Sequence, residues 1–236
     1  MPETLVLIPG MMCDARVFWH QIIALSGDWP VMVAASVRGA TIEEMAADIL
    51  TSLPTRFALA GQGMGGNVAL EIFRRAPERV SRIALISIAV QAETPQAAAA
   101  REERIVAAQA GRLAASLAAD VPASSLGPEV ARDEIMDMMR DMGLTLGEGV
   151  YLRQSRAMQR RPDQQKALRK AMLPALVMCG ALDPVTLPRR HQFIAEMLPY
   201  GRLQLIDDAG HMPTLEQPEA VTRVLEAWLT EPLLLR

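Results

Sequence analysis

Short, uninterrupted hydrophobic runs recur along the chain and are separated by longer amphipathic stretches. Most of these runs are apolar on both faces, which is typical of parallel strands covered by helices on either side of a sheet. They predict buried strands over residues 5–9 (LVLIP), 31–35 (VMVAA), 57–61 (FALAG), 83–87 (IALIS), 176–180 (LVMCG) and 203–206 (LQLI).

Helical patterns lie between several of these predicted strands. Thr41 and Glu44 form a capping box, which predicts a helix that begins there and runs to about Leu53. Further helices are predicted over residues 67–76, 189–197 and 216–229. Strands that alternate with helices indicate an α/β fold with a mostly parallel sheet.

One stretch interrupts the alternation. Residues 92–166 contain no convincing strand pattern and are rich in Ala, Arg, Glu and Met, with a strongly helical segment at 133–142 (DEIMDMMRDM). Four prolines punctuate the stretch, so we predict several short helices that pack over the top of the sheet. The domain prediction is therefore a core of residues 1–91 and 167–236, with residues 92–166 inserted as a helical cap.

Composition and charge narrow the classes of function. The chain has 236 residues, 50% hydrophobic and 22% charged, which suits a globular protein with a large core. A formal net charge of −3 argues against nucleic acid or an anionic membrane as a partner. No run reaches the length of a membrane span, and the chain enters a strand pattern without a basic leader. We therefore expect a cytoplasmic protein that binds a small-molecule substrate; no signal indicates an oligomeric state.

Two cysteines, Cys13 and Cys179, cannot form a disulfide framework, and neither has a second ligand at metal-finger spacing. Methionine is abundant, at 15, against 4 Phe, 3 Trp and 2 Tyr. Flexible thioethers fill irregular apolar spaces, so some of these methionines are candidates for lining a pocket. The candidates for substrate binding are Met12, Met212 and Met138.

The most informative segment is the strand, glycine turn and helix over residues 57–76. Gly61, Gly63 and Gly66 satisfy the dinucleotide-binding pattern G-x-G-x-x-G. That pattern also needs an acidic residue at the end of the next strand, and residues 83–90 (IALISIAV) contain none. Dinucleotide binding is therefore the weaker of two hypotheses for this turn.

The stronger hypothesis is a nucleophile elbow, G-x-S-x-G, in which a serine occupies a sharp turn between strand and helix. Here the turn is Gly61-Gln62-Gly63-Met64-Gly65, so Gly63 stands where the serine is expected. Glycine adopts the positive φ of such a turn without steric cost, but it has no side chain that can attack a substrate.

Three further segments favour the elbow. Residues 5–13 (LVLIPGMMC) end a strand in a Pro-Gly loop, residues 176–184 (LVMCGALDP) place Asp183 beyond another strand, and residues 205–218 (LIDDAGHMPTLEQP) place His211 after the last strand. Nucleophile position, then Asp, then His is the chain order of one hydrolase fold. With these motifs, nearly the whole chain resembles the α/β-hydrolase superfamily.

The resemblance implies a role for each matching residue. His211 would be the general base and acid, and Asp183 would orient its imidazole. The backbone N–H groups of Met11 and Met64 would form the oxyanion hole, and Gly63 would occupy the nucleophile position. No metal or organic cofactor is implied.

Several residues compete with these assignments. Asp207 and Asp208 are rival acids, although they lie beside the last predicted strand. Cys13 is a rival nucleophile, although free cysteine is more often a buried hydrophobic residue. The arginines of the predicted cap would bind a substrate carboxylate if they faced inward, but a solvated helix face is favoured: Arg153, Arg156, Arg160 and Arg161.

The functional expectation is an acyl hydrolase, namely an esterase or else a lactonase or amidase, that acts on a small apolar substrate. Gly63 at the nucleophile position predicts an impaired enzyme, whether the replacement is engineered or natural. Two alternatives on the same fold stay open: a binding protein without turnover, and an enzyme in which His211 acts directly on water or substrate. Dinucleotide binding is the least favoured alternative.

Overall fold

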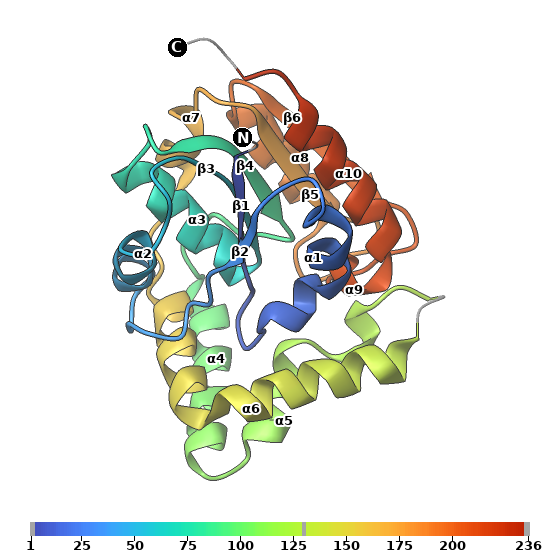
Figure 1. Cartoon of the computed structure of the whole chain (residues 1–236). Helices are drawn as coiled ribbons and strands as arrows, with labels where there is room; N and C mark the ends of the chain where they lie inside the picture. The colour runs from blue at the N-terminus through green and yellow to red at the C-terminus, as the bar shows by residue number, and fades with distance from the viewer. Residues whose placement is uncertain (1–2, 129–130, 234–236) are drawn as a thin grey trace.

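The computed structural model describes residues 3–128 and 131–233. Within these ranges, six strands form one fully parallel sheet in the order β2-β1-β3-β4-β5-β6 (Figure 1). The α/β fold predicted from the sequence is confirmed. The strands are β1 (Thr4–Ile8), β2 (Val31–Val33), β3 (Phe57–Gln62), β4 (Val80–Ile86), β5 (Ala175–Gly180) and β6 (Gly201–Ile206).

The sheet separates two hydrophobic cores because side chains alternate along each strand. Val6 and Ile8 of β1 pack with α2 (Ile42–Leu50), α3 (Met64–Arg75) and α8 (Pro188–Met197). On the other face, Leu5 and Leu7 pack with α10 (Pro218–Thr230) and the end of α1 (Trp19–Leu25), which follows a short 3₁₀ helix, η1 (Ala15–Phe18). Covering on both faces explains why the central strands are apolar on both sides.

Local sequence signals determine several helix ends. The Thr41 hydroxyl oxygen accepts the Glu44 backbone N–H at 3.1 Å, so α2 begins as the capping box predicts. The single helix predicted over 216–229 is instead two: α9 (Pro213–Glu216) and α10. Gln217 between them has φ −135° and ψ 62°, because the residue before Pro218 is driven out of the helical region.

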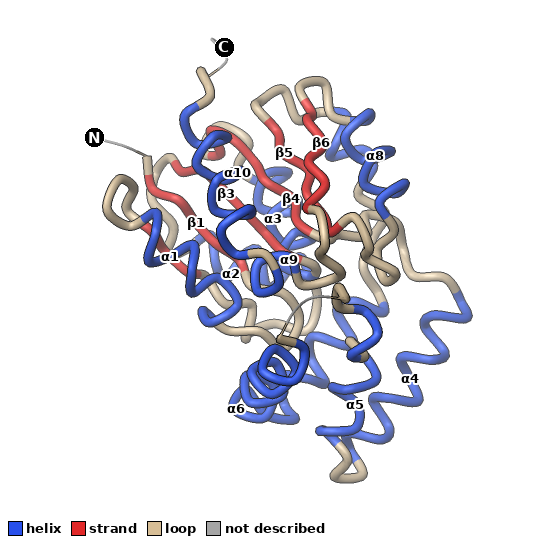
Figure 2. The backbone as a smooth tube through the Cα atoms, turned by 90° about the vertical axis from the view of Figure 1, so that its right-hand side faces the viewer, coloured by secondary structure: helices blue, strands red, loops and turns tan. Residues whose placement is uncertain are grey.

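The chain between β4 and β5 is helical, as predicted, and most of it gathers at one end of the sheet (Figures 1 and 2). Its helices are α4 (Pro95–Gln109), α5 (Leu113–Asp120), η2 (Ala123–Ser125), α6 (Arg132–Gln159) and α7 (Gln165–Arg169). The last helix of this stretch, α7, lies toward the opposite end (Figure 1). We call α4, α5, η2 and α6 together the insertion. The domain boundary predicted after residue 166 falls inside α7, which packs against α3 and α8.

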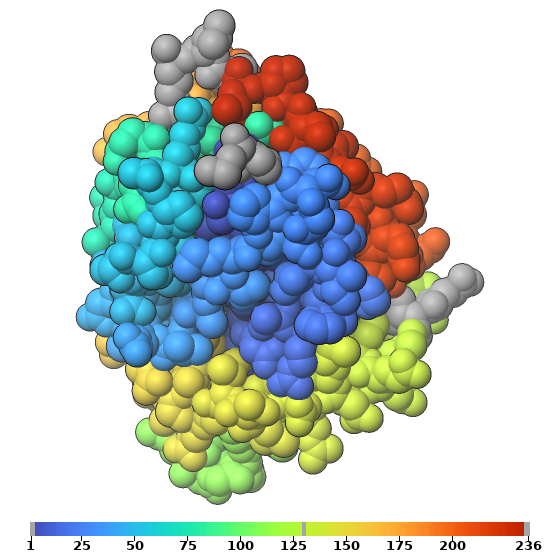
Figure 3. All heavy atoms as spheres, viewed as in Figure 1, coloured from blue at the N-terminus to red at the C-terminus, as the bar shows by residue number. Residues whose placement is uncertain are grey.

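The predicted series of short helices is only partly matched. The segment predicted at 133–142 continues into α6, which turns at Gly147, where φ is 82°. Seen from the side drawn in Figure 3, atoms of the insertion lie directly against the N-terminal part of the chain. No helix within the described ranges combines the length and the apolar character needed to cross a membrane.

Candidate active site

The turn between β3 and α3 has the backbone of a tight elbow. Gly63 has φ 52° and ψ −120°, and its N–H donates to the Ile86 carbonyl at 2.8 Å. A Cβ on Gly65 would lie 2.1 Å from the Ile8 carbonyl oxygen, whereas a Cβ on Gly63 would meet only the Gly10 Cα, at 3.9 Å. Packing therefore requires glycine at 65, but at 63 only the positive φ favours it, and the space there admits a side chain.

Close contacts also account for the other two glycines of the dinucleotide-like pattern, Gly61 and Gly66. A Cβ on Gly66 would lie 2.8 Å from the Ile88 Cδ1 atom. A Cβ on Gly61 would lie 2.3 Å from the Gly65 carbonyl oxygen. These close approaches of α3 to β3 and β1 explain the glycine-rich turn without a bound phosphate.

Asp183 and His211 meet at the carboxyl ends of β5 and β6. His211 Nδ1 lies 3.0 Å from Asp183 Oδ2, and Asp183 is almost completely buried. The Asp183 carboxylate also accepts the N–H groups of Val185 and Thr186 and the Thr186 hydroxyl, at 2.6–2.9 Å. Burial raises the pKa of Asp183, but the hydrogen bonds from His211 and Thr186 outweigh it, so the net pKa is lowered and the carboxylate stays charged.

The outer nitrogen of the His211 ring is available for chemistry. Nε2 makes no hydrogen bond with the part of the chain that the structure describes, and His211 lines a cavity that also includes Gly63. With Asp183 on Nδ1, the neutral ring carries its proton there and leaves Nε2 as an acceptor. This arrangement suits a general base that faces the elbow.

Two backbone amides beside the elbow are also unused. Neither the Met64 N–H, at the N-terminus of α3, nor the Met11 N–H donates to another group within residues 3–128 and 131–233. The next amide, that of Met12, does have a partner, because it donates to Gln154 Oε1 of α6 at 2.8 Å. Met12 has φ 55°, so Gln154 helps to hold a strained loop in place.

The cavity has a volume of about 670 Å³ and lies between the sheet and the insertion. Met12 and Met212, two of the three methionines predicted to bind substrate, line it. Met138 does not: 39% of its surface is exposed, and its neighbours Met136 and Met139 line the cavity instead. Successive helical positions point about 100° apart, so a cavity-facing position could not be assigned from the methionine-rich sequence alone.

The rival candidates lie in unfavourable settings. Burial, together with the nearby Asp14 charge, raises the pKa of the Cys13 thiol to about 12, so it stays protonated and is a poor nucleophile. Asp207 and Asp208 are exposed and do not line the cavity. His191 is buried and bonded to the backbone at both ring nitrogens, which indicates a structural role.

Sequence reasoning missed several polar residues around the site. Glu216 accepts the N–H groups of Gly210 and Met212, which flank His211, both at 2.7 Å. Buried Ser87 Oγ and Asn67 Oδ1 belong to cavity-lining residues and have no partner within the described ranges. Glu93, Arg101 and Arg161 form a buried ionic cluster. Arg161 is therefore buried and does not lie on the solvated helix face favoured from the sequence. No local motif marks Glu93, Arg101 or Glu216. In the described parts of the chain, no group of three or more His, Cys, Asp or Glu side chains is arranged to hold a metal ion.

Comparison with known proteins agrees with this geometry. The sequence model of a family described as "Alpha/beta hydrolase family" matches residues 5–224. The chain is 29% identical over 209 residues to a pimeloyl-[acyl-carrier protein] methyl ester esterase of Aromatoleum aromaticum, covering 80% of each chain. It is 25% identical to 3-oxoadipate enol-lactonase 2 of Acinetobacter baylyi, covering 89% of this chain and 82% of that protein.

Solved structures share the fold at lower identity. A thermophilic esterase from Thermogutta terrifontis, solved with malate bound, superposes with a TM-score of 0.86 at 24% identity, covering 97% of this chain and 90% of that one. The enol-lactonase from Burkholderia xenovorans gives a TM-score of 0.85 at 23% identity, covering 98% and 92%. Both show the same arrangement of sheet and helices.

Proposed function

Because the chain belongs to the α/β-hydrolase family, we propose that it is a hydrolase of ester bonds in small, largely apolar molecules. One observation carries the proposal: His211, bonded to buried Asp183, borders the same cavity as Met11 and Met64, whose amides are free, and the open turn at Gly63. An esterase and an enol-lactonase among the relatives support esters or lactones as the substrate class. The insertion acts as the cap over this cavity.

The roles follow from the geometry with a serine at position 63. Its hydroxyl oxygen bonds to the acyl carbon while His211 Nε2 takes the hydroxyl proton, and that proton then leaves with the alcohol. Water next attacks the acyl-enzyme, giving its proton to Nε2, and the acid is released as the serine regains its proton. The Met11 and Met64 amides stabilise the oxyanion in both steps.

Gly63 removes the nucleophile but leaves the rest of this site in place. Water activated by His211 is then the only nucleophile, and no acyl-enzyme forms. Serine hydrolases that lack one member of the triad keep about 10³- to 10⁴-fold acceleration over water, from the oxyanion hole and binding. The chain with Gly63 is therefore an impaired hydrolase.

The test is Gly63→Ser, with Gly63→Ala as the matched control. Both variants carry the same φ strain and the same Cβ, so they differ only in the hydroxyl group. We expect Gly63→Ser to hydrolyse short aryl and methyl esters with a burst of alcohol and to react with a fluorophosphonate. Gly63→Ala and the unchanged chain should show neither the burst nor the label.

The other outcomes identify the alternative functions. A folded Gly63→Ser variant that hydrolyses no ester and takes no label would refute the hydrolase. If the cavity still binds small molecules in that case, the chain is a binding protein. If the unchanged chain is already active and His211→Ala abolishes that activity, His211 acts directly on water.

A further inference from the structure

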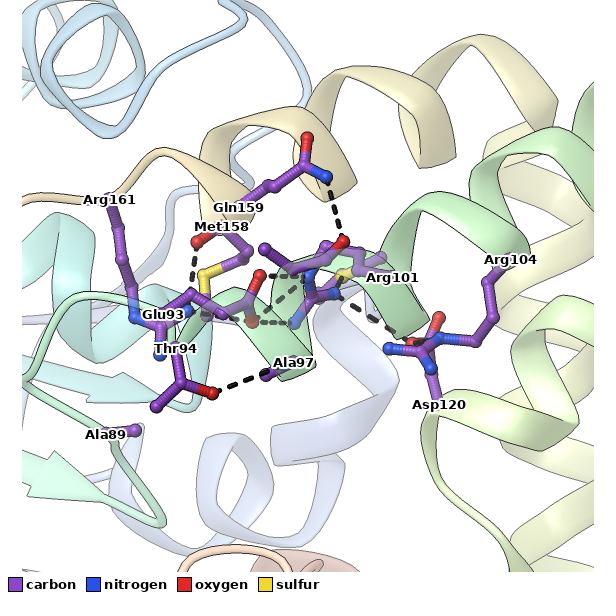
Figure 4. Close-up of polar contacts among 12 residues, drawn as sticks. Ala89, Glu93, Thr94, Ala97, Arg101, Arg104, Asp120, Met158, Gln159 and Arg161 are labelled. Atoms are coloured by element: carbon purple, nitrogen blue, oxygen red, sulfur yellow. Dashed lines mark hydrogen bonds and ion pairs between the residues drawn. The ribbon is translucent and has the colours of Figure 1, made fainter.

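A buried ionic cluster borders the cavity where α4 faces the end of α6. The Glu93 carboxylate, only 6% exposed, lies between the guanidinium groups of Arg101 and Arg161, which are 12% and 8% exposed (Figure 4). Arg101 reaches Glu93 with Nε and Nη2, at 2.8 Å for the shortest pair, and Arg161 reaches it with Nη1 at 3.2 Å. Two arginines thus share one carboxylate.

The neighbouring carboxylate, that of Asp120, does not supply the second negative charge that would neutralise Arg101 and Arg161. Asp120 accepts Arg104 Nε at 2.7 Å and the Tyr151 hydroxyl at 2.8 Å, and it is 3.9 Å from Arg101 Nη1. The cluster therefore holds three guanidinium groups against two carboxylates, an excess of one positive charge. Burial lowers the pKa of Arg161 although Glu93 acts to raise it, which agrees with this incomplete compensation.

The unsatisfied edges of both arginines belong to cavity-lining residues. Arg161 Nε and Nη1 donate to the Gln91 and Met158 carbonyls at 2.9 Å, but its Nη2 has no partner within residues 3–128 and 131–233. Arg101 Nη1 has only the Met11 sulfur, at 3.7 Å, and the distant Asp120. These donors are not among the described polar atoms that are buried without a partner, so an anionic or polar group in the cavity can reach them.

The shape of α4 leaves room for such a partner. Ala97, Ala100, Arg101 and Arg104 recur at helical spacing, so they share the face of α4 that lines the cavity. The two alanines keep space open beside the guanidinium of Arg101. Because Arg101 also contacts Met11, a ligand held here lies next to the loop that supplies the Met11 amide.

We propose that Arg101 and Arg161 form a carboxylate-binding subsite, so that the substrate is a small ester or lactone that also carries a free carboxylate. One monoanion balances the excess charge of the cluster, and planar guanidinium groups suit a carboxylate. The remaining charged residues on the cavity wall, Asp137, Arg140 and Arg190, are exposed to solvent and are therefore weaker anchors. This inference rests on the proposed function in one respect: the bound carboxylate is a substrate only if the protein is a hydrolase. The binding of a carboxylate does not itself require turnover.

The experiment measures binding to the unchanged chain, so it does not depend on turnover. The probes are 4-oxohexanoate, 5-oxoheptanoate and 6-oxooctanoate, in which a ketone replaces the ester and cannot be hydrolysed. Their carboxamides have the same shape without the charge. By calorimetry we expect at least one keto acid to bind about 10- to 100-fold more tightly than its amide, with the difference decreasing in salt.

Two variants should shift this preference in opposite directions. Arg161→Met cancels the excess charge and should abolish the preference for the acid, whereas Glu93→Gln adds to the excess and should increase it about tenfold. Arg160→Met, at an exposed arginine that does not line the cavity, is the matched control and should leave it unchanged. A cluster that only joins helices would change stability in both variants without these opposite shifts in affinity.

Equal binding of acids and amides, or binding of neither, would overturn the subsite. This failure is distinguishable from that of the proposed function. If the Gly63→Ser variant hydrolyses neutral esters without any preference for acids, the hydrolase proposal stands and the subsite is refuted. If the chain clearly prefers acids but its serine variant hydrolyses nothing, the subsite stands and the hydrolase proposal is refuted.

Discussion

At the scale of single residues, Glu216 holds His211 in place. Its carboxylate accepts the N–H groups of Gly210 and Met212 on either side of His211, and also that of Gly127 in the loop after η2. Asp183 and His211 could be predicted from sequence because their motifs are local. Glu216 could not, because a carboxylate that accepts loop N–H groups has no sequence signature, although two of its three donors are only four and six residues away.

Replacing this carboxylate should loosen the His211 loop. In Glu216→Gln, an amide NH₂ must face an N–H donor, so we expect a loss of about 1–3 kcal/mol in unfolding free energy. On the Gly63→Ser background, ester hydrolysis should fall about 10- to 100-fold because the imidazole is misplaced. Urea unfolding and steady-state kinetics measure the two effects. Glu219→Gln, an exposed residue in α10, is the control; equal behaviour of both variants would contradict this role.

The second residue-scale prediction concerns His191. Its Nε2 accepts the Ile88 N–H at 3.0 Å, which requires the neutral ring, and burial lowers its pKa. In the unfolded chain this histidine gains a proton below about pH 6.5, while the folded chain resists protonation. The contribution of His191 to the free energy of unfolding is therefore fully present above that pH and decreases as the pH falls below it.

The measurement is unfolding free energy between about pH 7 and pH 5. His191→Gln should be less stable than the unchanged chain at neutral pH. Its unfolding free energy should also decrease less steeply as the pH is lowered. His20→Gln replaces an exposed histidine and should keep the original slope. An unchanged slope in His191→Gln would show that other groups cause the acid sensitivity.

At the scale of elements, the turn from β3 to α3 needs glycine for two reasons: close packing at Gly65 and a positive φ at Gly63. The spacing of the glycines in the sequence fits both a nucleophile elbow and a phosphate-binding loop, and the motif alone does not distinguish them. The difference lies in tertiary contacts: Gly65 touches β1, which is far away in sequence, whereas Gly63 has open space above it.

These contacts predict a ranked series of alanine variants. Gly65→Ala places a Cβ 2.1 Å from the Ile8 oxygen and should cost at least about 3 kcal/mol, because backbone must move. Gly63→Ala adds only φ strain, about 1–2 kcal/mol. Gly27→Ala meets no atom within 4 Å and should change stability by less than about 1 kcal/mol. Denaturant unfolding measures the order, and a Gly63→Ala cost equal to that of Gly65→Ala would contradict it.

The insertion shows the limit of pattern reading for helices. Its helical character follows from composition, and the absence of a strand between β4 and β5 within the described residues agrees with it. The length of α6 did not follow, because Gly147 permits a positive φ that joins two helical stretches at an angle. Which side of α6 faces the cavity depends on packing against the core. The sequence therefore predicts Met138 in the cavity wall, whereas Met136 and Met139 line it.

At the scale of the whole molecule, the insertion is joined to the core on both sides of the cavity. Near the His211 loop, Ser125 O accepts the His211 N–H at 2.8 Å. Near the elbow, Gln154 of α6 accepts the Met12 N–H and donates to the Ser36 carbonyl at 2.9 Å. The insertion thereby supports both His211 and the loop that carries the Met11 amide.

Gln154→Met tests this coupling at the elbow side. The change keeps a similar volume but leaves the buried Met12 N–H and Ser36 carbonyl without partners, which should cost about 1–3 kcal/mol. Because Met12 has a positive φ, the freed loop should relax, and hydrogen exchange at residues 11–13 should accelerate more than in the sheet. On the Gly63→Ser background, kcat should fall while acid-probe binding stays within about threefold, since Arg101 and Arg161 are untouched.

Gln192→Met, on the exposed side of α8, should change none of these quantities. Slow exchange at residues 11–13 in Gln154→Met, equal to that control, would mean that the loop holds its shape without the insertion.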